Sequence, residues 1–397
     1  MELLSKRIRK IEESATLAMA RKSRELKEKG KHIINLSLGE PDFNTPDFIK
    51  KAAKNAIDQN FSKYTPVPGY KELLEVISLK FKRDNQLTYL PNEIVCSTGA
   101  KQSIAQVLMA LLNKNDEVIL PAPYWVSYSQ MVQLAGGKSK VIPTNIKNNF
   151  KINSEELRNA ITPKTKVFLF SSPCNPSGSV YSKDELISLS KVFEEHKNII
   201  IISDEIYEHI NFTKKHFSIG SVKEIKNQVV TINGLSKGYA MTGWRFGYLG
   251  APLKIAQACI KMQGQITSAT CSITQRAAIT ALNRHPKCTY EMCSKFKKRR
   301  DIIIEKLSEI KNIQINQPDG AFYIFPDVSK YFNKKYKDIR IQNSHDLSMF
   351  LLEVGGVSTV PGNAFGLNNH IRISYAASEH ELLEACRLIK ISLEKLR

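Results

Sequence analysis

The sequence predicts an α/β protein, in which a large domain with a mostly parallel β-sheet flanked by helices stands beside a smaller α+β domain. Three observations indicate this. Short apolar stretches typical of buried strands recur between about residue 94 and residue 250. Helix-length amphipathic stretches separate several of them. The chain has 397 residues, which is enough for roughly two to three domain-sized units with sizeable cores.

Six apolar, β-rich stretches are the expected strands of the large domain, and they occupy residues 93–97, 117–120, 140–143, 166–170, 199–203 and 228–232. The expected helices between them include residues 104–112, 154–160 and 182–195. Ser154 and Ser182 each precede an acidic residue within three positions, as helix N-caps with capping boxes do. Short apolar strands that alternate with helices indicate a parallel sheet covered on both faces. Ligands of such sheets bind at the carboxyl ends of the strands.

The two ends of the chain differ from this pattern. The first part contains one helical stretch (15–29) and a loop rich in glycine, proline and asparagine. After about residue 285, long charged helices alternate with short strands (321–325 and 371–374). We therefore expect three regions: an N-terminal arm with part of the small domain (1–47), a large domain (48–284) and a small C-terminal domain (285–397).

The chain carries 58 basic and 38 acidic residues, a net charge of +20. Such a charge can indicate a nucleic-acid partner or a membrane surface. However, the basic clusters are dispersed along the chain, and none is interleaved with aromatic residues as a single-strand binding groove would be. We expect a solvated basic surface and no nucleic-acid partner.

Hydropathy and cysteine usage narrow the class further. No aliphatic run approaches the roughly 18 residues that a membrane span needs, and the N-terminus lacks the apolar core of a secretory signal. We expect a soluble, cytoplasmic protein without a membrane partner. The seven cysteines are irregularly spaced and include no CxxC pair, so neither a disulfide framework nor a metal site is predicted. Cys288 and Cys293 could form half of a metal site, but no second pair follows them.

Lys237 is the first candidate catalytic residue. It follows the expected strand 228–232, and the small residues Gly234 and Ser236 beside it let a ligand approach the backbone. A desolvated lysine near other cations has a lowered pKa and can form a Schiff base. Arg245 follows closely and could hold an anion in bidentate fashion. The alternative is a loop lysine near an ion-paired arginine.

Asp204 directly follows the expected strand 199–203. A carboxylate that emerges from a buried strand needs a cationic partner, because an isolated buried charge is costly. A protonated pyridine nitrogen would serve, and an aspartate there makes the ring a better electron sink. An N-cap for a following helix is the alternative. Tyr207 could donate its phenol to a ring oxygen, or it could simply be packed in the core.

Two further loops offer groups that bind oxygen atoms and anions. Asn175 lies in SSPCNPSG, directly after an expected strand, and offers its side-chain amide. The stretch STGAKQ follows a strand and opens a helix, so the free N–H groups of Gly99, Ala100 and Lys101 could cradle a phosphate. It lacks the P-loop and dinucleotide-binding signatures. All four stretches follow strands expected in one sheet, which predicts a single ligand site.

With these motifs in place, the chain resembles the class I aminotransferases, pyridoxal-phosphate enzymes of the aspartate aminotransferase type. The resemblance is greatest to the bacterial I-beta subgroup of aspartate and prephenate aminotransferases, and it extends from about Ser14 to the C-terminus. It rests on the ordered blocks SATLA, GEPDF, YTPVPG, STGAKQ, PYWVSY, NPSG, SDEIYEH, LSKGYAMTGWRFGY, GAFY, VPGNAFG and IRISYA. It implies the fold of the pyridoxal-phosphate-dependent transferases, with the cofactor in the large domain, and a homodimer with shared active sites.

The resemblance also implies roles for the matching residues. Lys237 would form the Schiff base with pyridoxal 5′-phosphate and transfer the proton, while Asp204 would pair with the ring nitrogen. Asn175 and Tyr207 would bond the phenolic oxygen, and Trp125 would stack on the ring.

The implied contacts of the phosphate and the substrate complete the set. The phosphate would be held by Gly99, Ala100, Lys101, Ser236, Arg245 and Tyr64 of the partner subunit. The substrate would be bound through its α-carboxylate by Arg372, Asn175 and the Gly39 backbone, beside Trp125, and through any second carboxylate by Lys101. The plainer alternatives are a core role for Trp125, loop packing for Tyr64 and a surface ion pair for Arg372.

Together these expectations describe a transaminase that converts L-aspartate and 2-oxoglutarate to oxaloacetate and L-glutamate by a ping-pong mechanism. Another reaction on the same cofactor stays open: an aromatic or prephenate, kynurenine or alanine aminotransferase, or a carbon–sulfur lyase. Glu12 stands where many members of the subgroup have Lys or Arg, and it would repel a dicarboxylic substrate unless it points away. A nucleic-acid-binding protein on an inactive transaminase scaffold is a more distant alternative, against which the intact Lys237, Asp204, Asn175 and Arg372 argue.

Overall fold

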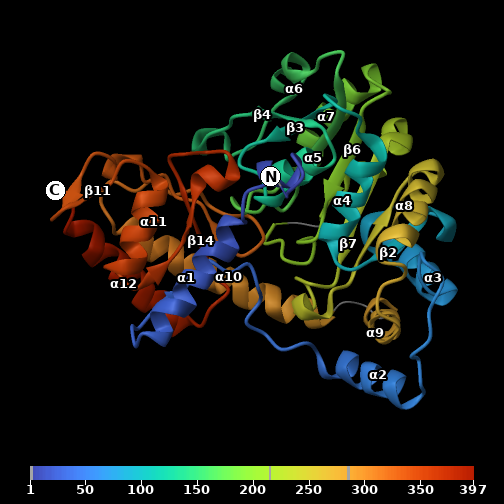
Figure 1. Cartoon of the computed structure of the whole chain (residues 1–397), viewed down its shortest axis with the longest axis horizontal. Helices are drawn as coiled ribbons and strands as arrows, with labels where there is room; N and C mark the ends of the chain where they lie inside the picture. The colour runs from blue at the N-terminus through green and yellow to red at the C-terminus, as the bar shows by residue number, and fades with distance from the viewer. Residues whose placement is uncertain (1–2, 214–215, 284–286) are drawn as a thin grey trace.

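The central element is a seven-stranded sheet (Figure 1). The computed structural model describes residues 3–213, 216–283 and 287–397. In spatial order the strands are β2 (Ile94–Ser97), β8 (Gly247–Gly250), β7 (Val229–Gly234), β6 (Ile200–Asp204), β5 (Thr165–Ser171), β3 (Glu117–Pro121) and β4 (Lys138–Ile142). Only β8 runs antiparallel to its neighbours β2 and β7, so the sheet is mostly parallel as predicted. The sequence did not predict β8, because its two glycines weaken the signal of a strand.

Both faces of the sheet are covered, and the alternation of side chains along β5 shows how. Val167 and Leu169 pack in the cluster that contains buried residues of α4 (Ala100–Leu111), α5 (Ser127–Leu134) and α8 (Leu253–Ile266). Phe168 and Phe170 point to the opposite face and pack with α6 (Ser154–Ala160) and α7 (Lys183–Glu195). A strand buried on both faces is typical of a parallel sheet between helix layers.

The predicted helix N-caps were half right. The Ser182 hydroxyl accepts the Glu185 N–H at 3.2 Å and caps α7, with the Glu185 carboxylate completing the capping box. Ser154 was wrong as a cap: it is the first residue of α6, and the Asn153 side chain accepts the Glu156 N–H at 2.9 Å instead. An asparagine is an equally good cap, and here it lies at the spacing from Glu156 that a capping box requires.

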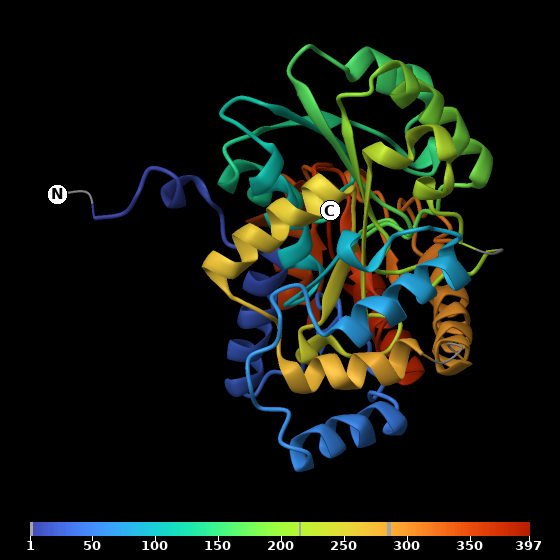
Figure 2. The same cartoon turned by 90° about the vertical axis from the view of Figure 1, so that its right-hand side faces the viewer.

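A second part of the molecule combines segments from both ends of the chain (Figures 1 and 2). Strand β1 (Ile34–Asn35) pairs in parallel with β12 (Val357–Ser358), and a three-stranded antiparallel sheet has the order β13 (Val360–Pro361), β14 (Ile371–Ser374), β9 (Tyr323–Ile324). Around them lie α1 (Ala15–Glu28), α10 (Lys287–Ser308), α11 (Ser344–Glu353) and α12 (Glu379–Glu394). The predicted boundaries at residues 47 and 284 stay a prediction.

The remaining helices lie at the β2 side of the large sheet (Figure 1). They are α2 (Asp47–Asp58), α3 (Lys71–Lys80) and α9 (Ser272–Leu282), and their buried side chains share a core with β2 and β8. The N-terminal segment projects away from the body of the molecule (Figure 2). Among the described residues, no helix is both long enough and apolar enough to cross a membrane.

Candidate active site

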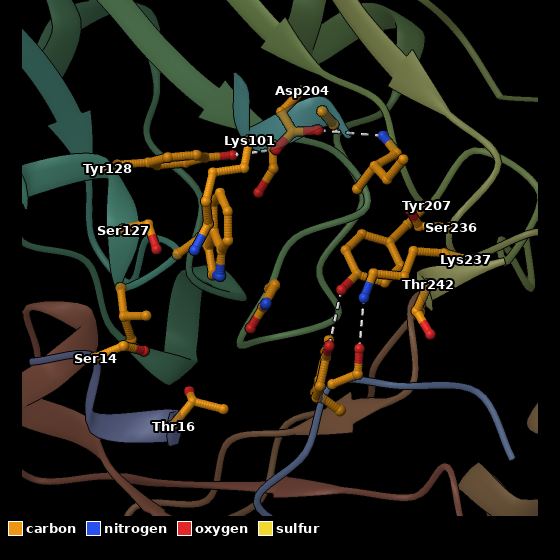
Figure 3. A pocket seen from close by; sticks show the side chains of 18 of the residues that line it. Ser14, Thr16, Lys101, Ser127, Tyr128, Asp204, Tyr207, Ser236, Lys237 and Thr242 are labelled. Carbon is orange, nitrogen blue, oxygen red and sulfur yellow. Dashed lines mark hydrogen bonds between the residues drawn. The ribbon is translucent and has the colours of Figure 1, made fainter. Parts of the chain in front are cut away.

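A cavity of about 270 Å³ lies where strands β5, β6 and β7 end, between the large sheet and strand β14 (Figure 3). It gathers residues that are far apart in the sequence, as expected for the carboxyl ends of parallel strands. Of the predicted site residues, it is lined by Gly39, Ala100, Lys101, Trp125, Asn175, Asp204, Tyr207, Ser236, Lys237, Arg245 and Arg372. It is also lined by residues to which the sequence analysis gave no role, among them Ser14, Thr16, Tyr128, Thr242 and Tyr323.

Lys237 points into the cavity, and its ammonium group donates a hydrogen bond to the Gly39 carbonyl (Figure 3). Burial lowers the pKa of Lys237 to about 8, against the opposing effect of the Glu40 carboxylate. The positive charges of Arg372 and Arg245 lower it further. A lysine with such a pKa has a usable fraction of neutral amine near neutral pH, which is the form that attacks a carbonyl carbon.

Asp204 is the last residue of β6 and is only 4% exposed. Its Oδ2 atom accepts a hydrogen bond from the Tyr128 hydroxyl at 2.6 Å, and its Oδ1 atom accepts the Ile206 N–H at 3.3 Å. Burial raises the pKa of Asp204 to about 6, while the Tyr128 hydrogen bond lowers it. Asp204 does not cap an α-helix, because turns follow it in the described part of the chain. Its neutral partners leave the carboxylate charge to be balanced by whatever enters the cavity.

The guanidinium of Arg372, on β14, is 1% exposed and therefore forms no surface ion pair. It donates to the Asn175 Oδ1 at 3.0 Å and to the Ser37 carbonyl, and it lies 4.5 Å from the centre of the Tyr323 ring. Its Nε has no hydrogen-bond partner, and no carboxylate among the described residues forms an ion pair with it. A buried guanidinium without an acidic partner is matched by an anionic ligand.

Tyr207 and Tyr323 connect these groups. Their hydroxyls are 2.8 Å apart, and the ring of Tyr207 lies 5.8 Å from the Lys237 ammonium (Figure 3). Burial raises the pKa of Tyr207 far above its ordinary value, so its hydroxyl keeps a proton that it can donate to a ligand oxygen. Sequence reasoning missed Tyr323, although it lies in the GAFY block, because a tyrosine in a short β stretch is typical of core packing.

The loop that opens α4 has the form of an anion cradle. Gly99, the N-cap, has a φ of 88°, and a Cβ atom there would lie 2.4 Å from the Arg245 Nη2. Arg245 also has a positive φ, 55°, and donates to the carbonyls of Thr98 and Thr242. Helix α4 is 12 residues long, and its N-terminus together with the adjacent guanidinium of Arg245 favours the binding of a phosphate.

Lys101 adds a second cation beside this loop. Burial lowers the pKa of Lys101, and the charge of Arg245 lowers it further. Its ammonium group lies 4.9 Å from the centre of the Trp125 ring, a cation–π distance. Trp125 is half-buried and lines the cavity, and its ring meets the ring of Tyr128 edge to face, so it is not a core residue alone.

Two residues of interest lie outside the cavity. Tyr64 is 98% exposed and lies beside a separate surface hollow formed by residues 62–65 and 269–272. Glu12 is exposed, and its backbone N–H donates to the Gln130 side chain. Although Ser14 and Thr16 line the cavity, Glu12 does not, so its carboxylate does not face a ligand there.

Comparison with known proteins identifies the class to which this fold and this site belong. Residues 31–389 match the family described as aminotransferase class I and II, and the chain therefore belongs to this family. This confirms the predicted family, and the chain is an enzyme that transfers amino groups.

Particular relatives place the chain more narrowly. It is 46% identical to a "Probable aspartate/prephenate aminotransferase" of Rickettsia bellii, over 97% of this chain and 98% of that protein. It is 42% identical to the aspartate/prephenate aminotransferase of Cereibacter sphaeroides, over 98% of each chain. The solved aspartate aminotransferase of Rhizobium meliloti is similar with a TM-score of 0.96 and 39% identity over all of both chains. The Thermus thermophilus aspartate aminotransferase with maleate is similar with a TM-score of 0.93 and 37% identity, over 99% of this chain and 100% of that one. These likenesses confirm the predicted fold class.

Proposed function

We propose that the protein is a pyridoxal-phosphate-dependent transaminase that converts L-aspartate and 2-oxoglutarate to oxaloacetate and L-glutamate. One observation carries the proposal. The guanidinium of Arg372 is buried without a carboxylate partner among the described residues, and it lines the same cavity as Lys237 and Asp204. An amino acid and a 2-oxo acid share one group, the α-carboxylate, and Arg372 is placed to bind it in either half of a transamination. The printed names of the relatives support aspartate as the amino donor.

The residues of the cavity fit pyridoxal 5′-phosphate by their chemistry. An amine with a pKa of about 8 suits the aldehyde, a buried carboxylate suits the ring nitrogen, and a helix N-terminus beside Arg245 suits the phosphate. When bound, the cofactor supplies an aldehyde that holds the substrate amine and a ring that stores the electrons of the broken Cα–H bond.

The residues of this chain then have distinct tasks. The neutral amine of Lys237 would hold the cofactor covalently and would serve as the base that takes the proton from the substrate Cα. Asp204, fixed by the Tyr128 hydroxyl, would accept in its ionised form the hydrogen bond of the protonated ring nitrogen. Tyr207 and Asn175 would offer hydrogen bonds to the ring oxygen, and Trp125 would stack against the ring.

Specificity for a dicarboxylic donor depends on a second cation, and Lys101 is placed to supply it. Lys101 and Arg372 line the same cavity, so the two could bind the two carboxylates of aspartate. Because Glu12 lies outside the cavity, it does not oppose this. Prephenate is the second candidate acceptor, since the relatives with 42–46% identity carry it in their names.

We further propose a homodimer in which Tyr64 completes the phosphate site of the other copy. An aromatic side chain that is 98% exposed beside a surface hollow is an unusual feature unless a second copy covers it. Mixing a Tyr64→Ala protein with an Arg372→Ala protein should restore one intact site in each hybrid dimer. Activity that never exceeds the sum of the parents, after proven subunit exchange, would contradict shared sites.

The deciding experiment combines one variant with a panel of donors. We expect Lys237→Ala to lose both the visible absorbance of the lysine-bound cofactor and the transaminase activity. In the donor panel, the native protein should prefer aspartate over alanine, phenylalanine and kynurenine as the amino donor to 2-oxoglutarate. Full activity of Lys237→Ala would refute the catalytic assignment. Release of pyruvate and ammonia from cysteine-type donors would indicate lyase chemistry instead.

A further inference from the structure

Behind the cavity, on the far side of the turn that carries Asp204 and Tyr207, lies a buried charged cluster. We name it the Lys80 cluster, and it consists of Lys80, Asn85, Glu205, Glu208 and His216. Lys80 ends α3 and is 0% exposed, which is exceptional for a lysine. The reaction proposed above assigns no role to this cluster.

The polar groups of the cluster form short hydrogen bonds with one another. The Lys80 ammonium donates to the Glu208 Oε1 and, at 2.6 Å, to the Asn85 Oδ1, while the Asn85 amide donates to the Glu208 Oε2. The Glu205 carboxylate accepts hydrogen bonds from the Ser203 and Ser218 hydroxyls at 2.9 and 2.6 Å.

His216 completes the cluster on the side of Glu205, with its Nε2 atom 2.9 Å from the Glu205 Oε2. Although burial lowers the pKa of His216, the Glu205 carboxylate raises it above the ordinary value. The cluster thus holds two carboxylates against one ammonium and one imidazole of raised basicity.

Glu205, Glu208 and His216 place their ligand atoms within 4.8 Å of one another, a spacing that a metal ion could use. The Lys80 ammonium, however, is already bound to Glu208 from within the cluster, so the cation of this site is part of the chain.

The cluster and the active site lie on opposite sides of the segment formed by the end of β6 and the turn that follows it. Asp204 and Tyr207 direct their side chains into the cavity, whereas Glu205 and Glu208 direct theirs into the cluster. Backbone hydrogen bonds of 2.9 Å from the Glu208 N–H to the Glu205 carbonyl and 2.8 Å from the Ile210 N–H to the Tyr207 carbonyl hold the turn. A displacement of either glutamate would therefore move a residue of the active site.

A second contact reaches the loop of the catalytic lysine. The His209 Nε2 lies 3.2 Å from the Glu208 Oε1, and the His209 ring packs against Gly238, where a Cβ atom would lie 2.9 Å from its Cδ2. Gly238 directly follows Lys237. Through His209, the cluster is therefore also connected to the backbone segment that carries Lys237.

The charge of the cluster also acts on Asp204. The Glu205 carboxylate raises the pKa of Asp204, in addition to the larger effect of burial. The Lys80 ammonium and His216 oppose the negative field of the two glutamates. Without Lys80, an uncompensated carboxylate in the interior would favour the protonated form of its neighbours, and a protonated Asp204 cannot balance a positive ring nitrogen.

We propose that Lys80 is a positioning residue for the reaction. Through Glu208 and Glu205, Lys80 holds the turn behind Asp204 and keeps the Asp204 carboxylate ionised. This inference rests on the proposed cofactor site. The two can fail separately, because Lys237→Ala removes the covalent link and leaves the cluster intact.

The experiment compares two variants with opposite charge effects, Lys80→Met and Glu208→Gln. The polar and titratable groups around Lys80 and Glu208 are Asp84, Arg83, Asn85, Glu205, His209, His216, Tyr239 and Tyr248. Removal of the positive charge of Lys80 should shift the pH midpoint of the cofactor's visible band upward, because neighbouring groups are then protonated more easily. Removal of the Glu208 charge should shift it downward. Each shift should be about half a pH unit or more, and the apparent Kd of the apoprotein for pyridoxal phosphate should rise about tenfold in Lys80→Met.

Controls separate this role from a purely structural one. The double variant Lys80→Met/Glu208→Gln restores the charge balance, so its midpoint should return toward the native value. Lys306→Met removes an ion-paired lysine from the outside of α10 and should change neither quantity. Since glutamine has the shape of glutamate and keeps an acceptor for Lys80, Glu208→Gln can be tested even where Lys80→Met does not fold. Native midpoints and native cofactor affinity in the folded variants, with only the melting temperature lowered, would overturn the proposal.

Discussion

The buried carboxylate of Asp204 should make the apoprotein less stable than it would be without that charge. Burial raises its pKa from 3.8 to about 6, so the folded protein holds this proton more tightly than the unfolded chain does. The free energy of unfolding of the native chain therefore falls as the pH rises from about 4 to about 6, and stays low above that. A shift of about 2 pH units corresponds to a cost of about 3 kcal/mol well above pH 6, and to only a small part of that at pH 4.

The variant Asp204→Asn tests this cost directly. Asparagine keeps an acceptor for the Tyr128 hydroxyl, but its amide group replaces the oxygen that accepts the Ile206 N–H, a loss of about 1 kcal/mol that does not depend on pH. We expect the apo-form of the variant to be about 2 kcal/mol more stable than the native apoprotein at pH 7.5, and to lose this advantage at pH 4.

The assay is urea unfolding of both apoproteins at equal concentration and at the two pH values. Asp58→Asn is the matched control, since it removes the same charge from an exposed site at the end of α2. A variant that is less stable than the native chain at both pH values, or equally affected at both, would refute the reasoning.

Three further predictions concern the ligands of the cavity. Tyr128→Phe removes a hydrogen bond that lowers the pKa of Asp204, so the acid limb of the kcat/KM profile should move up by about 1 pH unit or more, as a pH titration of activity would show. Gly99→Ala should displace the Arg245 guanidinium and weaken cofactor binding roughly tenfold or more in an apoprotein titration, whereas Gly136→Ala, with a φ of 87° but open space around its Cβ, should not. Lys101→Ala should lower kcat/KM for aspartate and glutamate roughly 30- to 150-fold and leave alanine and phenylalanine nearly unchanged; equal losses for both kinds of donor would show that Lys101 serves only the phosphate loop.

The sequence was a good guide wherever a local pattern decides the structure. The apolar runs predicted six strands because a parallel sheet buries both faces of each strand, and the position of Lys237 after one of these strands predicted that it would lie at the ligand-binding edge of the sheet, where it lines the cavity. Likewise, the position of Asp204 at the end of a strand predicted that a charge would meet the cavity there. These features depend on spacing within one short segment, which a sequence displays directly.

Contacts between distant segments were not predictable in this way. Tyr128 and Asp204 are 76 positions apart, and Arg372 and Asn175 are 197 apart, so no local period shows that each pair forms a hydrogen bond. Lys80 is a sharper case, because a lysine at the end of an amphipathic helix is normally solvated. Only the folded arrangement of α3 against the turn at Glu208 shows that it is buried.

The partners of three charged groups that line the cavity, Asp204, Lys237 and Arg372, explain why a ligand, and not the protein, balances their charges. Asp204 is held by a phenol, Lys237 by a backbone carbonyl, and Arg372 by an amide and another carbonyl, so each is hydrogen-bonded but not neutralised. Burial has moved the pKa of each toward its neutral form, up for the carboxyl and down for the two bases. The Lys80 cluster shows that this chain pairs other buried charges with one another. That the cavity leaves these charges unpaired is therefore a property of the site. It favours a molecule that brings a cation to Asp204 and a carboxylate to Arg372, and such a molecule should stabilise the fold by pairing both charges.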